Sequence, residues 1–199
     1  DEETGLNNYN PKSKLVPRIE AVSCWDFYPD PDAVTIEDAD YVIQRHNYTK
    51  SQVRDLANRP YFRNDAIREC IAMGSNYEAR GYESSLLDRE TTDEFDKNRY
   101  EILEFWGYLD KELAVQAGLD IDEDSLDDLD EIQVNCWTCN GKILRLVLNP
   151  FTPGRIPYLV SPYEINPYQF FGVGIPENMD DSQTIMNGHA RMAIDNLAL

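Results

Sequence analysis

Long apolar runs are missing from this sequence, because none approaches the roughly 20 residues that a membrane-spanning helix requires. It also lacks a basic amphipathic segment that could lie on a bilayer surface. These two absences predict a protein with no membrane partner. The chain has no hydrophobic signal segment, it starts at Asp1, and no helix stop signal follows its last periodic residues. We expect it to be part of a longer protein.

Histidine is scarce, and the known catalytic signatures are absent. His46 and His189 are the two histidines, and no GxSxG, Walker A, HExxH or kinase motif occurs. Carboxylates are abundant, but their spacing in the sequence cannot place two of them across a cleft. We therefore expect no enzymatic activity and no cofactor, and a carboxylate-based hydrolase remains one alternative.

Four cysteines are too few for a disulfide scaffold in a chain of 199 residues. Cys136 and Cys139 form one CxxC pair, which is half of a zinc ribbon, whereas Cys24 and Cys70 stand alone. The pair falls in an expected strand and so lacks the helix N-terminus that activates redox thiols. We expect structural thiols and no metal site.

Basic side chains are in the minority, with 18 against 37 acidic ones, and the formal net charge is −19. Proteins that grip duplex DNA neutralise its phosphates with Lys and Arg, so this charge argues against ordinary DNA binding. The net negative charge is compatible with a channel through which DNA slides. It is equally compatible with a surface charge that only keeps the protein in solution.

The composition present, with 42% hydrophobic residues, can bury a core in one domain or in one domain plus an appended helix. Residues 1–16 are polar and rich in turn formers, and they predict a flexible arm. Residues 17–171 predict an α+β domain that is mainly antiparallel β with short packing helices. Residues 172–199 predict one long helix.

The most acidic tract covers residues 120–131, DIDEDSLDDLDE. Its carboxylates fall at positions 1, 3, 5, 9 and 12 of the EF-hand pattern. However, Ser125 stands where that loop needs glycine, and Asp127 stands where it normally has an apolar residue. We favour a solvated linker, and an acidic calcium-dependent or protein-binding module is the alternative.

Alternating apolar and polar residues predict strands over residues 17–27, 40–48 and 100–110. The clearest local signal is a hairpin over residues 131–149. There Asn140 and Gly141 supply the two positive-φ residues of a type I′ turn. Further on, β-favouring residues interrupted by prolines predict short edge strands and turns over residues 158–165.

Capping residues predict two short helices. Thr49 is expected to open a helix that continues to residue 58, and Asn64 to cap a second helix that ends at Gly74. Their apolar stripes predict that both helices pack on one face of the sheet. A helical turn is expected over residues 35–40.

The longest helix is expected to start at Pro176, where Glu177 complements the positive end of the helix dipole. Its apolar residues recur at helical spacing: Met179, Met186, Ala190, Ala193, Ile194 and Leu197. Such a stripe most often packs into a core. Here the alternative is a contact between subunits.

The segment FFGVGIPENMDDSQTIMNGHARMAIDNLAL resembles the portal, or head-to-tail connector, proteins of short-tailed double-stranded-DNA bacteriophages. The positions that match the family's pattern before and within its stem helix are Phe171, Gly172, Gly174, Pro176, Glu177, Gln183, Asn187, Arg191 and Asn196. EFWGYLD, NPFTPGRIPY and the wing-like stretch SCWDFYPDPDAVTIEDADYVIQRHNYTKSQVRDL extend the resemblance over about residues 18–199.

This resemblance implies a structural subunit, spanning the wing and the start of the stem, of a homo-oligomeric ring of twelve. Genomic DNA would be packaged and ejected through the ring without sequence-specific binding. Terminase and tail adaptor proteins are the implied partners. The implied location is the portal vertex of the virion, and the host cytoplasm during assembly. The subunit-interface or channel residues that we expect are Met179, Asp180, Asp181, Gln183, Met186, Asn187, His189, Arg191 and Asn196.

Overall fold

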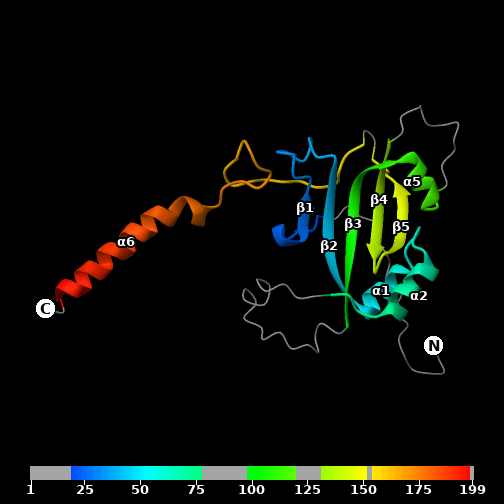
Figure 1. The fold of residues 1–199 in the computed structure, drawn as a ribbon, viewed down its shortest axis with the longest axis horizontal. Helices are drawn as coiled ribbons and strands as arrows, with labels where there is room; N and C mark the ends of the chain where they lie inside the picture. Colours follow the sequence, from blue (N-terminus) through cyan, green and yellow to red (C-terminus); the bar gives the residue numbers. More distant parts are fainter. Residues whose placement is uncertain (1–18, 78–97, 120–130, 152–153, 198–199) are drawn as a thin grey trace, which may run out of the picture.

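A five-stranded antiparallel sheet is the centre of the computed structural model, which describes residues 19–77, 98–119, 131–151 and 154–197 (Figure 1). The strands lie side by side in their sequence order, so that each pairs with the next one along the chain. The expected α+β class with mainly antiparallel strands is confirmed. The strands are β1 (Phe27–Pro29), β2 (Tyr41–Thr49), β3 (Arg99–Asp110), β4 (Glu131–Cys139) and β5 (Lys142–Leu148).

The predicted hairpin is confirmed as β4 and β5. Asn140 and Gly141 form its turn with φ values of 51° and 69°, as a type I′ turn requires. The side-chain amide of Asn140 also donates hydrogen bonds to the carbonyl oxygens of Cys70 (3.2 Å) and Gly74 (3.0 Å). The turn is therefore tied to the helix that covers this end of the sheet.

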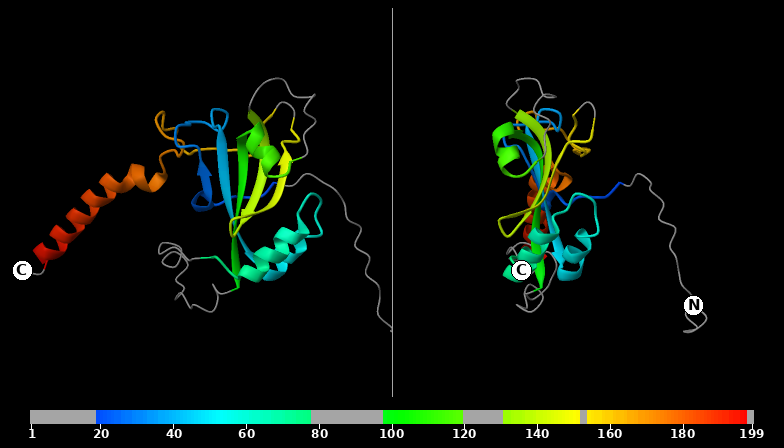
Figure 2. Two further views of the ribbon diagram at one scale, coloured as in Figure 1. Left: turned by 45° about the vertical axis from the view of Figure 1, so that its right-hand side comes forward. Right: turned by 90° about the vertical axis from the view of Figure 1, so that its right-hand side faces the viewer.

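The two predicted short helices are α1 (Lys50–Leu56) and α2 (Asn64–Met73), and they lie side by side near one end of the sheet (Figure 2). Thr49 caps α1 in a capping box with Gln52, as expected for its N-terminus. The predicted cap of α2 is wrong by one residue, because Arg63 occupies that position without a side-chain cap and Asn64 is already helical. Gly74, with φ of 95°, follows the last residue of α2.

The main apolar core lies between these helices and the sheet, and confirms that α1 and α2 pack on one sheet face. Its buried members are Val53, Leu56, Phe62, Ile67, Cys70, Tyr100, Ile102, Trp137, Cys139 and Leu144. At about 25 cal/mol per Å² of buried apolar surface, such a cluster is the largest favourable contribution to folding.

The helix α5 (Lys111–Gln116) has no counterpart among the sequence predictions. It follows β3 directly, and its Ala114 is fully buried against Ile132, Val134 and Leu146. Phe105 packs on the same cluster, and it points to the opposite face from Ile102 because side chains alternate along β3. The sheet therefore carries helices on both faces.

Two predictions for the first part of the chain are wrong. The strand expected over residues 17–27, of which residues 17 and 18 lie outside the described part, starts only at Phe27 within residues 19–27. It follows a 3₁₀ turn over Cys24–Asp26 in which the Ser23 hydroxyl accepts from the backbone N–H of Trp25. No helical turn forms over residues 35–40. The buried carboxylate of Asp30 organises this loop instead, because it accepts from the backbone N–H groups of Asp32 (3.0 Å) and Asp40 (3.3 Å).

The predicted edge strands over residues 158–165 are wrong as well. This segment forms one isolated antiparallel bridge, between Glu164 and Val173. Pro157, Pro162 and Pro167 explain the result, because each removes a backbone donor that a strand ladder would use.

The last element is α6 (Ile175–Leu197), which confirms the predicted long helix and projects away from the sheet (Figure 1). Among the described residues, no helix is long and apolar enough to cross a membrane. The acidic tract over residues 120–130 lies outside the described residues, and so do residues 78–97.

Candidate subunit-interface helix

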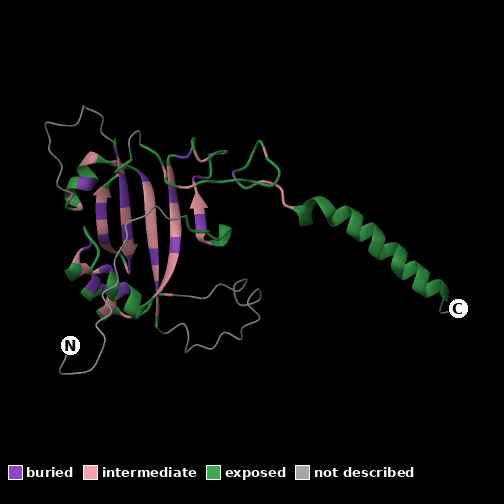
Figure 3. Cartoon of the chain, turned by 180° about the vertical axis from the view of Figure 1, so that it is seen from behind, coloured by how far each residue is buried: buried purple, intermediate pink, exposed green. Residues whose placement is uncertain are grey.

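None of the residues of α6 is buried, although the helix has 23 residues and is about 35 Å long (Figure 3). Its large apolar side chains are therefore open to solvent. Those exposed by more than half are Met179 (55%), Ile185 (62%), Met186 (70%), Met192 (54%), Ile194 (65%) and Leu197 (87%). Most of the stability of a helix in a protein comes from tertiary packing of its apolar face, and α6 lacks such packing because none of its residues is buried.

The apolar and the charged residues of α6 occupy different sides. At 3.6 residues per turn, Met179, Met186 and Leu197 fall on one line, which Ala190, Ala193 and Ile194 widen to about a quarter of the circumference. Ile185 and Met192 lie apart from this stripe, and polar residues separate them from it. The charged residues Glu177, Asp180, Asp181, Arg191 and Asp195 fall on the opposite side. The helix thus has an exposed apolar stripe, defined by Met179, Met186, Ala190, Ala193, Ile194 and Leu197, and a separate charged side.

The nine sequence-predicted interface or channel residues all lie on α6 and occupy different sides of it. Met179 and Met186 belong to the apolar stripe, and Gln183 interrupts it, whereas His189 and Asn196 lie on a polar flank of the stripe. Asp180, Asp181, Asn187 and Arg191 belong to the charged side. Sequence analysis missed the exposed Ile185 and Met192, because they lie outside the stripe that the helical period marks.

The base of α6 is fastened to the sheet through the segment that precedes it. Phe170 is only 8% exposed, and its ring centroid lies 5.8 Å from that of Phe27 on β1. Tyr158 packs on the same ring at 5.1 Å and donates a hydrogen bond of 2.6 Å to the side chain of Gln44 on β2. These contacts connect the helix to the β1 edge of the sheet.

A close backbone approach at Gly172 lies just before α6. A Cβ atom on Gly172 would collide with the carbonyl oxygen of Glu164 and would lie 2.6 Å from Cβ of Pro162, so only glycine fits. The Val173 N–H donates to this same carbonyl oxygen at 3.0 Å. In the first turns of α6, Asn178 Nδ2 donates to the Glu164 carboxylate at 2.6 Å. Glu164 and Asn178 are positioning residues that sequence analysis did not identify.

A polar cluster on the sheet is the other arrangement that could suggest chemistry. The Glu104 carboxylate accepts from Trp106 Nε1 (2.8 Å) and Asn135 Nδ2 (3.0 Å), and His46 Nε2 lies 2.7 Å away. Burial would raise the pKa of the Glu104 carboxyl, but these three partners, led by His46, hold it below its usual value. A carboxylate that is ionised and hydrogen-bonded in this way acts as a structural acceptor within the sheet.

The sequence pairs Cys136 with Cys139 in a CxxC motif, but in the structure the neighbour of Cys139 is Cys70. Cys139 Sγ lies 3.0 Å from Sγ of Cys70 on α2, although the two residues are far apart in the chain. The hydrogen bond with Cys70, together with burial, raises the pKa of the Cys139 thiol. Burial raises the pKa of Cys136 to about 11. Within the described part of the chain, no group of three or more Cys, His, Asp or Glu side chains could hold a metal ion.

One comparison with known proteins gives a match. The family model described as phage SU10 portal protein matches residues 6–199, which is nearly the whole chain. No curated protein matches the chain.

Proposed function

The chain belongs to the phage SU10 portal protein family and therefore has a structural role in a phage portal, and we propose that it is a subunit of a closed ring through which genomic DNA is packaged and ejected. In this proposal α6 contacts a neighbouring subunit and borders the channel. The ring has twelve subunits, as the resemblance of the motifs over residues 171–196 implies. Assembly takes place in the host cytoplasm, and the finished ring occupies the portal vertex of the virion.

The exposed apolar stripe of α6 is the observation that carries this proposal. Monomeric proteins rarely leave a large continuous apolar patch in water, and such patches mark contact surfaces. Met186 is 70% exposed and Leu197 is 87% exposed on this stripe. Packing against a second helix would remove apolar surface from water and would stabilise α6 by the tertiary contacts that it lacks within the subunit.

The fixed base of α6 supports the ring geometry. In a cyclic ring every subunit makes the same heterologous contact, so the angle between the interface element and its domain must be the same in each copy. The close approach at Gly172, the Glu164 to Val173 bridge and the Asn178 hydrogen bond restrict this angle. The charged side of α6, with Asp180 and Arg191, is then available for the channel or for solvent.

The net charge of −19 supports passage of DNA in preference to its retention. Phosphates bind where Lys and Arg release their counterions, and a surface with an excess of carboxylates offers few such sites. DNA can then slide along the channel without sequence-specific binding. The proposed partners at the two ends of the ring are the terminase during packaging and the tail adaptors afterwards.

Substitution of Met186 by Asp in the full-length protein tests the interface. A carboxylate in an apolar contact is costly to desolvate, and the ring repeats the change at every interface. Sedimentation velocity should therefore show rings for the parent protein and mostly monomers for Met186→Asp. The melting temperature of the variant monomer should stay within error of the parent monomer, because Met186 is exposed within the subunit.

Thr184→Asp is the matched control, since it adds the same carboxylate on the charged side of α6 and should leave the rings intact. A parent protein that is monomeric under all conditions would contradict the ring. If Met186→Asp unfolds the subunit, Met186 belongs to an internal core and the proposed interface is wrong.

A further inference from the structure

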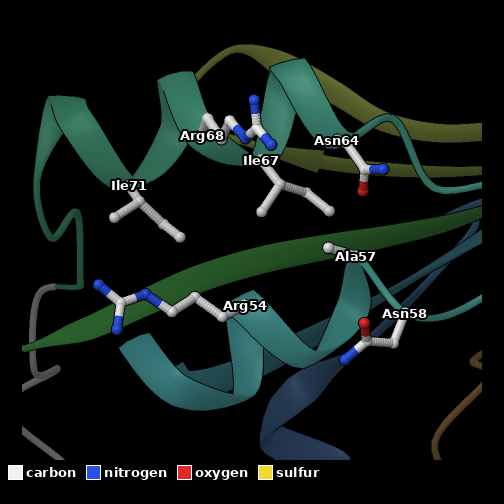
Figure 4. Close-up of a pocket in the computed structure, with 7 residues that line it drawn as sticks. All are labelled: Arg54, Ala57, Asn58, Asn64, Ile67, Arg68 and Ile71. Carbon is white, nitrogen blue, oxygen red and sulfur yellow. The ribbon is translucent and has the colours of Figure 1, made fainter.

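A hollow of about 440 Å³ lies between α1 and α2, on the side of the sheet away from α6 (Figures 1 and 4). Its walls come from both helices and from the turn after α1. The residues that line it are Arg54, Ala57, Asn58, Asn64, Ile67, Arg68 and Ile71.

The floor and the rim of this hollow differ in chemistry. Ile67 and Ile71 point from α2 into the space between the helices, where Ala57 faces them (Figure 4). Arg54 and Arg68 are exposed at the rim, and within the described part of the chain neither guanidinium has an ion-pair partner. The side-chain amides of Asn58 and Asn64 add neutral donors and acceptors. The hollow therefore combines an apolar floor with two free cations.

The local charge is opposite to that of the whole chain. Residues 50–68 hold five basic and two acidic side chains, whereas the chain as a whole has a net charge of −19. The basic residues of this segment are Lys50, Arg54, Arg59, Arg63 and Arg68. A cationic site surrounded by an anionic surface attracts negatively charged groups to one place.

We propose that the hollow between α1 and α2 is a docking site for an acidic peptide segment of a partner protein. One apolar side chain of that segment packs on the partly exposed Ile71 and Ala57, above the buried Ile67, and flanking carboxylates pair with Arg54 and Arg68. Guanidinium groups match carboxylates in bidentate geometry. Duplex DNA fits less well, because its phosphate backbone has no apolar group for the floor and the rest of the protein repels it. The site is independent of the ring contact made by α6.

Fluorescence anisotropy with the full-length protein tests the site. The probe is a labelled peptide in which one leucine is flanked on each side by two aspartates. Exchange of both arginines, in Arg54→Gln/Arg68→Gln, should raise the Kd for this peptide by at least about tenfold, because each arginine makes a charge-assisted contact. Arg155→Gln removes an exposed positive charge elsewhere and should leave the Kd unchanged.

Two altered peptides separate the contributions of the rim and the floor. Replacement of the aspartates by asparagine should abolish binding, and replacement of leucine by serine should weaken it severalfold. The melting temperature of the double variant should match that of the parent, since both side chains are exposed. The proposal would be overturned if the double variant bound the aspartate peptide with the same Kd as the parent. It would also be overturned if the parent bound the asparagine peptide as tightly as the aspartate peptide. So would a 20-base-pair DNA duplex that competes with the peptide at the same concentration, because the site would then be a nucleic-acid surface.

Discussion

Nε2 of His46 on β2 lies 2.7 Å from Oε2 of Glu104 on β3, and the pair occupies the middle of the sheet between two apolar clusters. On one side the His46 ring stacks on Trp137, with centroids 4.9 Å apart and an interplanar angle of 12°. On the other side Trp106 and Asn135 donate hydrogen bonds to the same carboxylate. Glu104 thereby connects three neighbouring strands through side chains as well as through the backbone.

Glu104→Gln should lower the free energy of unfolding by about 2–4 kcal/mol at pH 7. The substitution leaves His46 without its anionic partner in a site where the Glu104 side chain is only 12% exposed. Urea denaturation of both proteins measures the difference. Glu112→Gln, at an exposed position of α5, should change the stability by less than about 0.5 kcal/mol.

The difference in free energy of unfolding between the parent and Glu104→Gln should decrease as the pH falls. Because the pKa of Glu104 is lower in the folded state, its stabilising contribution is present above the unfolded pKa of about 4.5 and is lost as the pH falls through the folded value. The gap between parent and Glu104→Gln should therefore narrow between pH 5 and pH 3. A gap that stays constant over this range would show that Glu104 is not the group responsible.

Gly141→Val should destabilise the protein by more than about 1 kcal/mol. A β-branched residue is strained at the φ of 69° that the turn requires. No atom lies within 4 Å of the new Cβ, so a steric clash would not contribute. Gly141→Asn is the matched control and should cost much less, since asparagine tolerates positive φ. Equal melting temperatures for Gly141→Val and the parent would contradict the turn.

The Cys136 thiol should resist alkylation at pH 8, because burial raises its pKa to about 11 and little of the reactive thiolate is present. Mass spectrometry after treatment with iodoacetamide should find Cys24, which is exposed, modified before Cys136. The raised pKa also stabilises the fold up to about pH 9, and this contribution is lost as the pH rises to about 11. Cys136→Ala should therefore show a shallower loss of stability over this interval than the parent.

Calcium at 1 mM should leave the melting temperature unchanged within error. A site in residues 120–131 with a Kd of about 10 μM would be saturated and would add roughly 2.7 kcal/mol of stability, which a thermal scan detects easily. Magnesium at the same concentration controls for ionic strength. A rise of several degrees with calcium alone would mean that the acidic tract is a metal site and not a solvated linker.

Elements with strong local signals could be predicted from the sequence. The Asn140 and Gly141 dipeptide fixes a turn by its φ values, and the alternation over residues 100–110 identifies β3 whatever the rest of the chain does. The helical spacing of the apolar residues likewise predicted the long helix α6.

Features that depend on distant contacts could not be predicted. Cys70 and Cys139 come together only when α2 packs on the sheet. No spacing in the sequence predicts that their Sγ atoms lie 3.0 Å apart. The residues around Tyr158 and Ile165 have strand propensity, but the prolines among them and packing on Phe27 decide their conformation. For α6 the period identified the apolar stripe, whereas its complete exposure required knowledge of the whole fold.

The strand order β1-β2-β3-β4-β5 has a consequence for the timing of folding. Every strand pairs with the strand synthesised just before it, so the sheet can be completed from its first strand to its last without waiting for later parts of the chain. The helix α6 follows all five strands and makes no buried contact with them. Synthesis therefore delivers a finished sheet before the apolar stripe of the helix emerges. In the proposed ring, association of subunits would then be a separate bimolecular step, whose rate depends on protein concentration and not on the folding rate of the domain.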